Sequence, residues 1–273
     1  MRNHIRSLLV ALSFTSIAAS PSFAQTEIDQ RNTEVVQSVY LRTLSVDPSA
    51  ALVRNAQMAF DLAVRSYGAT NSRTADMAVN LGRALNGTGQ NEAAVPLLES
   101  ALSIYDEDGD QSKLRYALAQ YQLGVAHNGA GDTESAVAAL TTAYTVLEPN
   151  VRRLSADTSF IRTALQASGG AAAVSAAETA AARMAPMTTT PPKPKLQIPP
   201  SYPPDESEKS VNGWVLLDYR LWPDGRVRDV YVLAASPETV FDISAAMALQ
   251  QWRFEKPNDA NQHHQLSVAF NAQ

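Results

Sequence analysis

An internal repeat with a period of 42 residues is the feature that most constrains the fold of this chain. Leu81-Gly82 recurs as Leu123-Gly124, and the same offset relates four further pairs: Gly89 and Gly131, Ala94 and Ala136, Leu98 and Leu140, and Ala101 and Ala143. Each unit predicts a helix, a turn at its glycine, and a second helix. One such helical hairpin cannot bury its apolar face alone, so we expect stacked units.

This pattern resembles the tetratricopeptide repeat family in its longer, 42-residue spacing. The family's early large residue is missing, since Ala78 and Gln120 occupy that position. A degenerate unit around Phe60 to Tyr67 precedes the two good repeats, and a capping helix over residues 157–166 follows them. We therefore predict an all-α helical repeat array over residues 27–168.

A second pattern begins at Gly213. Val215, Leu217, Tyr219 and Leu221 alternate with Asp218 and Arg220, as expected for an antiparallel strand with one buried and one solvated face. Pro223-Asp224-Gly225 predicts a tight turn into a second strand. A helix is expected after Ser236-Pro237, followed by a short strand at Trp252-Arg253-Phe254.

These residues resemble the C-terminal domain of the TonB and TolA family over about Tyr202 to Phe270. The resemblance rests on Tyr202-Pro203, the Gly213-led strand, Asp224-Gly225, Phe241-Asp242 and Trp252-Arg253-Phe254 with Pro257. It implies a small α+β (β-β-α-β) domain over residues 201–273. The predicted chain is thus multidomain, with a helical array followed by this domain.

Residues 169–200 are predicted to form a linker between the helical array and the C-terminal domain. An Ala-rich run leads into a segment rich in proline, which has no amide hydrogen and restricts the residue before it to extended conformations. Such segments act as semi-rigid spacers. We expect a tether that holds two modules apart.

The first 24 residues predict a signal peptide. Arg2 and Arg6 precede an apolar run over residues 8–19, and Ser22-Phe23-Ala24 suits cleavage after Ala24. The run is shorter than the roughly 20 apolar residues of a membrane span, so no stable span is expected once the signal is cleaved. The expected location is the periplasm.

Composition excludes several classes of function. The net charge is −5, which argues against nucleic acid as a partner. The absence of cysteine excludes disulfides and thiolate metal sites. His263-His264 lacks a third ligand, and the turn over residues 106–110 lacks the Gly and Glu spacing of a calcium loop. No nucleophile elbow or phosphate loop appears, so we expect no enzyme activity and no cofactor.

Two surfaces are candidates for binding proteins. In the repeat family the first helix of each unit lines the concave groove, and the matching polar and aromatic positions here are Asp76, Arg83, Asn86, Tyr121 and Asn128. Asn86 and Asn128 either hydrogen-bond an extended peptide or simply cap and solvate helix ends.

The last strand of the small domain is the other candidate. In the family that it resembles, partner peptides add to this edge as an extra strand. We expect Leu266, Val268 and Phe270 to face the core and Gln265, Ser267 and Ala269 to face outward. An edge protected by the chain's own tail, which binds nothing, is the alternative.

The function predicted from these patterns is a non-catalytic periplasmic adaptor between envelope proteins. The resemblance implies a link to outer-membrane transport, with outer-membrane receptors among the partners. An anchored energy transducer is the runner-up and requires residues 8–19 to stay uncleaved. A cell-wall-associated structural protein is a third hypothesis.

Overall fold

The computed structural model describes residues 23–44, 48–107, 114–153, 158–186, 192–202, 211–237 and 239–271. The predicted signal peptide lies outside these residues except for its last two positions, and so does most of the acidic turn at 106–110. Within the described ranges, no helix is both long and apolar enough to cross a lipid bilayer.

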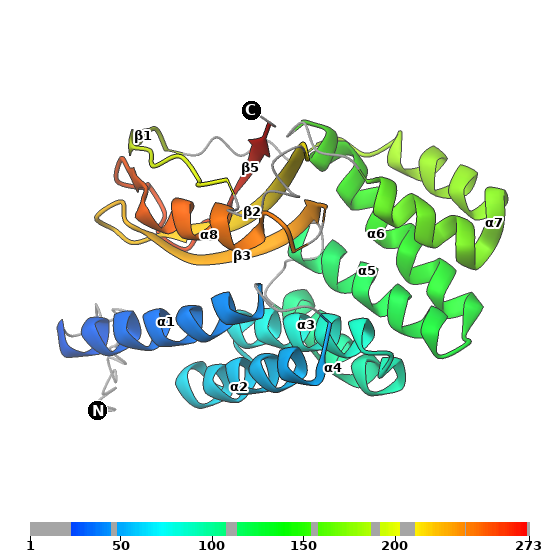
Figure 1. Cartoon of the computed structure of the whole chain (residues 1–273), viewed down its shortest axis with the longest axis horizontal. Coiled ribbons are helices and arrows are strands. Elements are labelled where there is room, and N and C mark those ends of the chain that lie inside the picture. Colours follow the sequence, from blue (N-terminus) through cyan, green and yellow to red (C-terminus); the bar gives the residue numbers. More distant parts are fainter. Residues whose placement is uncertain are drawn as a thin grey trace, which may run out of the picture.

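In the part of the chain that the structure describes, seven helices precede the C-terminal domain, and they form an arc around it (Figure 1). They are α1 (Phe23–Thr43), α2 (Ala50–Tyr67), α3 (Ser72–Gly87), α4 (Asn91–Glu107), α5 (Leu114–Gly129), α6 (Thr133–Arg153) and α7 (Ser159–Ala181). The helices pack as successive antiparallel pairs, and both repeat turns contain a glycine with positive φ, at Gly89 and Gly131. The predicted helical array is confirmed.

The repeat glycines allow close contact between the two helices of each unit. A Cβ atom on Gly124 would lie 2.5 Å from Cγ of Leu140, and one on Gly82 would lie 2.7 Å from a methyl carbon of Leu98. Both pairs are related by the 42-residue offset. The sequence repeat therefore reflects one packing contact used twice.

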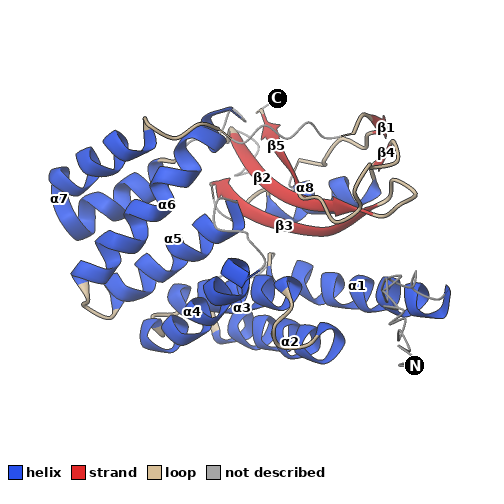
Figure 2. Ribbon diagram, turned by 180° about the vertical axis from the view of Figure 1, so that it is seen from behind, coloured by secondary structure: helices blue, strands red, loops and turns tan. Residues whose placement is uncertain are grey.

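The C-terminal domain contains a three-stranded antiparallel sheet of order β3-β2-β5, with one helix. Its elements are β2 (Gly213–Leu221), β3 (Val227–Ser236), α8 (Asp242–Gln251) and β5 (His264–Phe270). Val215, Leu217 and Tyr219 are buried in one cluster with Phe241 and Leu249 at the helix. Figure 2 shows α8 behind the sheet, on the side away from the viewer. The predicted α+β domain is confirmed.

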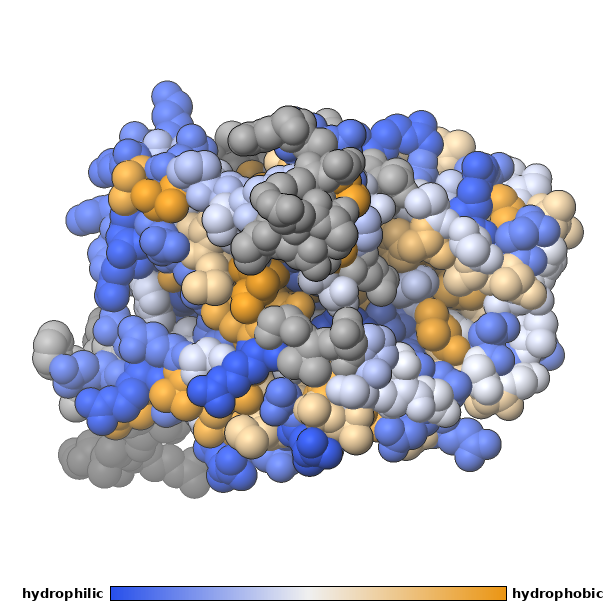
Figure 3. Space-filling view, in the orientation of Figure 1, coloured by the Kyte–Doolittle hydropathy of each residue, from blue (hydrophilic) through white to orange (hydrophobic). Residues whose placement is uncertain are grey.

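The other face of the sheet is not solvated, as the alternation had suggested, but covered by the helical array. Leu216 is fully buried and Asp218 is 1% exposed. Leu216 and Leu233 belong to one apolar cluster with Leu118 and Leu147 of the array. On the face drawn in Figure 3, hydrophobic atoms gather along the seam between the domain and the helices below it.

The segment expected to be a tether has a different structure. Helix α7 has a kink at Gly170, whose φ is 67°, and is helical again after it. In this second part Ala173, Ala177 and Ala181 are buried at a spacing of four residues. Further on, β1 (Pro194–Leu196) pairs with β4 (Arg253–Phe254). Small alanine side chains let the helix pack closely, so this segment joins the two modules without separating them.

Candidate functional site

The two edges of the C-terminal sheet differ, and β5 forms one of them. It pairs with β2 from Gly213 opposite Phe270 to Tyr219 opposite His264. Among the described residues no strand lies beyond it. Backbone groups along such an edge can pair with an added strand.

Side chains of β5 alternate between the two faces of the sheet. Leu266, Val268 and Phe270 pack against the core that α8 covers, as the sequence predicted. Of the opposite set, Ala269 is exposed, whereas Gln265 is 9% exposed. Gln265 is buried because its amide nitrogen donates to Oδ2 of Asp218, 2.8 Å away, beneath the array.

At the other edge, side chains of α1 hydrogen-bond to the backbone of β3. The side-chain amide of Gln37 donates to the carbonyl of Val230 at 2.7 Å and accepts from the amide of the same residue at 3.0 Å. The hydroxyl of Tyr40 accepts from the amide of Val232 at 2.9 Å. These contacts occupy backbone groups that an added strand would need.

Asp218 on β2 anchors a buried polar network that joins the sheet to the array. Arg115 of α5 lies between two carboxylates, with Nη2 2.5 Å from Asp76 and Nε 3.2 Å from Asp218. Nδ1 of His263 lies 2.7 Å from Asp218, and the hydroxyl of Tyr105 donates to Asp76 at 2.7 Å. The guanidinium of Arg115 also lies over a tyrosine ring on β3, 4.6 Å from its centre.

The two carboxylates of this network differ in their proton affinity. Burial raises the pKa of Asp76, and this effect outweighs the lowering by Arg115 and the Tyr105 hydroxyl. Burial also acts to raise the pKa of Asp218, but the neighbouring His263 and Arg115 together lower it. The ionised form of Asp218 is therefore the better stabilised of the two.

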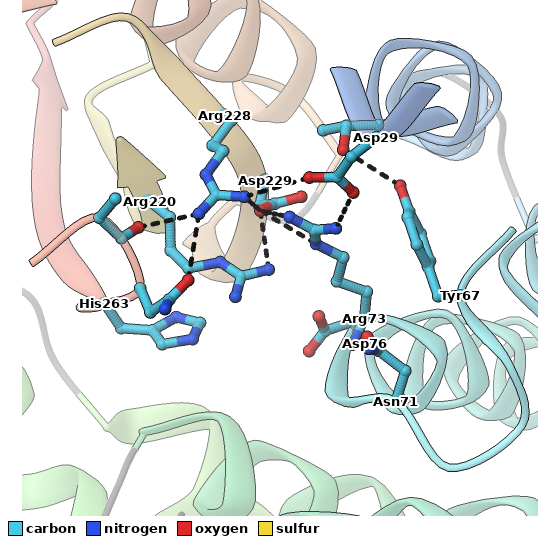
Figure 4. Close-up of polar contacts among 12 residues, drawn as sticks. Asp29, Tyr67, Asn71, Arg73, Asp76, Arg220, Arg228, Asp229 and His263 are labelled. Carbon is cyan, nitrogen blue, oxygen red and sulfur yellow. Dashed lines mark hydrogen bonds and ion pairs between the residues drawn. The ribbon is translucent and has the colours of Figure 1, made fainter. Parts of the chain in front are cut away.

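A second buried ion cluster lies at the start of β3 (Figure 4). Oδ2 of Asp229 lies 2.7 Å from Arg220 and 3.2 Å from Arg73 of α3, and Arg73 also pairs with Asp29 of α1 at 2.8 Å. Asp229 has a φ of 51° where the register of β2 and β3 shifts. This irregularity places its carboxylate among the arginines.

Arginines dominate the electrostatics of the second cluster. Burial acts to raise the pKa of Asp229, but Arg220, Arg73 and Arg228 lower it to about 2. Arg220 and Arg228 are directly opposite each other on β2 and β3, and burial together with these like charges lowers the pKa of Arg228 to about 10. The ionised Asp229 is therefore the negative charge that Arg220 and Arg73 share.

The residues predicted to line the repeat groove do not form one open surface, because each has its own contacts within the chain. Asp76 is bound to Arg115 and Tyr105. Asn86 donates to the carbonyl of Gln122 at 2.9 Å. Tyr121 packs edge-on against Phe160. Arg83 is half-buried beside β3, and the exposed Asn128 accepts from Ser168. Four of the five thus contact other residues of the array, and Arg83 alone of the five lies beside the sheet.

The sequence did not indicate the residues that join the modules. No local pattern marks these residues, because each pairs with a residue at least 39 positions away on another element. They are Gln37, Tyr40, Arg115 and Asp229. The one available signal was the polar pair Asp218 and Arg220 on an otherwise apolar strand.

Comparison with known families agrees with both parts of the fold. The model of the Gram-negative bacterial TonB protein C-terminal domain matches residues 198–272, and that of the tetratricopeptide repeat matches residues 73–148. The chain therefore carries tetratricopeptide repeats followed by a TonB C-terminal-type domain. Both families are non-catalytic kinds of domain.

Curated relatives match the C-terminal part of the chain. It is 30% identical over 88 residues to "Protein TonB" of Klebsiella pneumoniae, covering 32% of this chain and 36% of that protein. The identity is 35% over 63 residues for "Protein TonB" of Pseudomonas aeruginosa, covering 23% of this chain and 18% of the relative. The identity to "Protein TonB" of Escherichia coli is 34% over 56 residues, covering 20% of this chain and 23% of that protein. The chain thus spans well under half of these relatives.

Proposed function

We propose that this chain is a non-catalytic periplasmic adaptor whose β5 edge, residues 265–270, binds an extended segment of an envelope protein as an added strand. The observation that carries the proposal is the difference between the two edges of the sheet. Side chains of α1 occupy the backbone of β3 at Val230 and Val232, whereas no described strand lies beyond β5. Strand addition would combine main-chain hydrogen bonds with side-chain selectivity.

Outer-membrane receptors are the first partners to test, because the similar proteins are named TonB and the matched family is its C-terminal domain. The helical array would provide a second contact region, where Arg83 and Tyr121 are half-buried and Asn128 is exposed. In this proposal the array and the sheet act as one rigid unit, because buried ion pairs join them.

Two other functions use the same domains. An anchored TonB-type energy transducer requires that residues 8–19 remain in the inner membrane. A cell-wall-associated structural protein would bind peptidoglycan through either module. The N-terminal mass of the native protein separates the first two: a soluble chain beginning at Gln25 favours the adaptor, and an intact chain in the inner membrane favours transduction. Sedimentation with purified cell wall tests the third.

The strand-addition model is tested with synthetic peptides that cover the periplasmic segments of outer-membrane receptors from the same organism. Binding peptides should slow amide hydrogen exchange at residues 265–270 and leave exchange at Val230 and Val232 unchanged. Peptides that bind without protecting β5, or that protect β3, would show that the proposed edge is wrong.

A further inference from the structure

A groove lies at the β3 edge of the sheet, between α1 and the turn that joins β2 to β3. Its volume is about 360 Å³, within the range of roughly 300–1,000 Å³ that is usual for ligand sites. Leu41 of α1 and Val227 of β3 line it together with charged side chains. The groove therefore suits a ligand that carries aliphatic carbon as well as charge.

The wall of this groove that belongs to the C-terminal domain is basic. Arg226 after the turn, Arg228 on β3 and Arg253 on β4 all line it. Arg253 donates to two backbone carbonyls at 2.8 and 3.3 Å, and it forms no ion pair within the described ranges. Arg226 pairs with the adjacent, exposed Asp224. The positive charge of the wall is thus only partly balanced.

Two carboxylates also line the groove, but neither cancels this excess. Asp229 is 2% exposed, and it is bound by Arg220 and Arg73, which lie outside the lining (Figure 4). Glu34 is exposed on the opposite wall, on α1, and forms no ion pair with the residues that the structure describes. Burial, Arg220 and Arg73 lower the pKa of Arg228 to about 10 although Asp229 raises it, as expected where cations outnumber carboxylates.

The basic surface continues beyond the mouth of the groove. Strand β1 pairs with β4, so the residues around Arg253 on both strands extend this surface. Its exposed lysines are Lys193, Lys195 and Lys256. Glu255 is the one carboxylate among residues 193–196 and 253–256. The whole chain has a net charge of −5, so this surface is a local exception that favours an anionic partner.

We propose that this groove binds an acidic segment of a partner protein, with one carboxylate against Arg228 and Arg253 and further carboxylates along the lysines of β1. Charge complementarity is the argument for this occupant. Glu34 on the opposite wall repels a carboxylate placed there, so it fixes the side on which the segment binds. The groove and β5 lie at opposite edges of the sheet, and this proposal does not depend on strand addition.

Isothermal titration at low ionic strength tests the proposal with acetyl-Glu-Ala-Glu-Ala-Glu-Ala-amide and with its glutamine counterpart. The glutamate peptide should bind saturably, and added salt should weaken it, whereas the glutamine peptide should not bind. Arg253→Gln should lower the affinity about two- to fivefold, as expected for the loss of one exposed ion pair. The matched control is Arg54→Gln, an exposed arginine of α2 outside the groove, which should bind like the wild type.

Glu34→Gln provides a variant with the opposite sign. It removes the repelling charge and should raise the affinity for the glutamate peptide, a gain that a misfolded protein cannot produce. Equal binding of the two peptides, no saturable binding, equal affinities of Arg253→Gln and Arg54→Gln, or unchanged affinity in Glu34→Gln would each overturn the proposal. Inorganic phosphate is the remaining competitor. If it displaces the peptide at matched ionic strength in sodium chloride, the groove is a site for small anions and the assignment to a protein segment is wrong.

Discussion

Gln37 makes two hydrogen bonds to Val230, one to its carbonyl and one from its amide, although the two residues are 193 positions apart. A neighbouring strand would make the same pair of bonds. A single side chain of α1 thus replaces a strand at the edge of the sheet. This makes the helical array part of the C-terminal domain's structure, because it satisfies backbone groups that would otherwise be unpaired.

Gln37→Leu should therefore destabilise the whole chain. It leaves the amide and the carbonyl of Val230 buried without partners, at a cost of about 2–4 kcal/mol in the free energy of unfolding. Urea denaturation measures the effect. Gln57→Leu is the control, because Gln57 forms only an exposed bond within α2; equal stability of both variants would contradict the role of Gln37.

Arg115→Met should be strongly destabilising. The substitution leaves Asp76 and Asp218 as buried carboxylates without their shared cation, which typically costs about 3–5 kcal/mol. Arg152→Met is the matched control, because Arg152 pairs with Glu148 on an exposed face, where solvent screens the pair and it contributes little to stability. Chemical denaturation of both variants gives the comparison. A loss below that of the control would show that the network contributes nothing to stability.

The sequence predicted the elements but not the assembly. Helix pairs and the β2–β3 hairpin follow from periodicity, since 42-residue spacing and alternation are local properties. Asp218 and Arg220 lie on the polar face that the alternation predicts, but the array buries this face. Their charges are tolerated there because Asp218 pairs with Arg115 and Arg220 pairs with Asp229. Nothing local distinguishes a solvated aspartate from one whose partner lies 103 positions away, on a helix of the array.

The candidate site was anticipated to a similar extent. The strand over residues 265–270 and the inward set of Leu266, Val268 and Phe270 follow from a two-residue period. The burial of Gln265 does not, because it depends on the array lying over Asp218. Asn86 was expected to face either a peptide or solvent, and it instead binds a backbone carbonyl of the next repeat.

Acid should destabilise the second ion cluster in a defined pH range. The pKa of Asp229 is lowered in the folded state to about 2. The ionised carboxylate therefore stabilises the fold at any pH above the pKa of an aspartate in the unfolded chain, which is ~3.9. That contribution, about 2 kcal/mol, is lost as the pH falls from about 4 toward 2. Asp229→Asn should therefore flatten this part of the curve of unfolding free energy against pH, measured by urea titration. Asp61→Asn, at an exposed position of α2, should retain the wild-type slope, and an unchanged slope in Asp229→Asn would refute the assignment.

The repeat glycines give a test of packing. Gly124→Ala places a Cβ atom 2.5 Å from Leu140 and 3.2 Å from the carbonyl oxygen of Ala136. Overpacking of this kind costs about 1–3 kcal/mol. Gly87→Ala, whose Cβ atom would lie 3.4 Å from Pro48, should cost less than Gly124→Ala. Thermal unfolding ranks the two, and the reverse order would contradict the packing role of the repeated glycine.

Proline substitutions at adjacent positions of β5 test strand addition directly. The amides of Ser267 and Val268 point to opposite sides of the strand, so one faces β2 and the other faces the open edge. Proline at the inward position removes a ladder hydrogen bond and should destabilise the domain, while proline at the outward position should be tolerated, as on other edge strands. The tolerated variant should lose binding of the receptor peptides that protect β5 in the wild-type protein. If it folds and still binds those peptides with unchanged affinity, the partner does not add to this edge, and the adaptor must bind through the array.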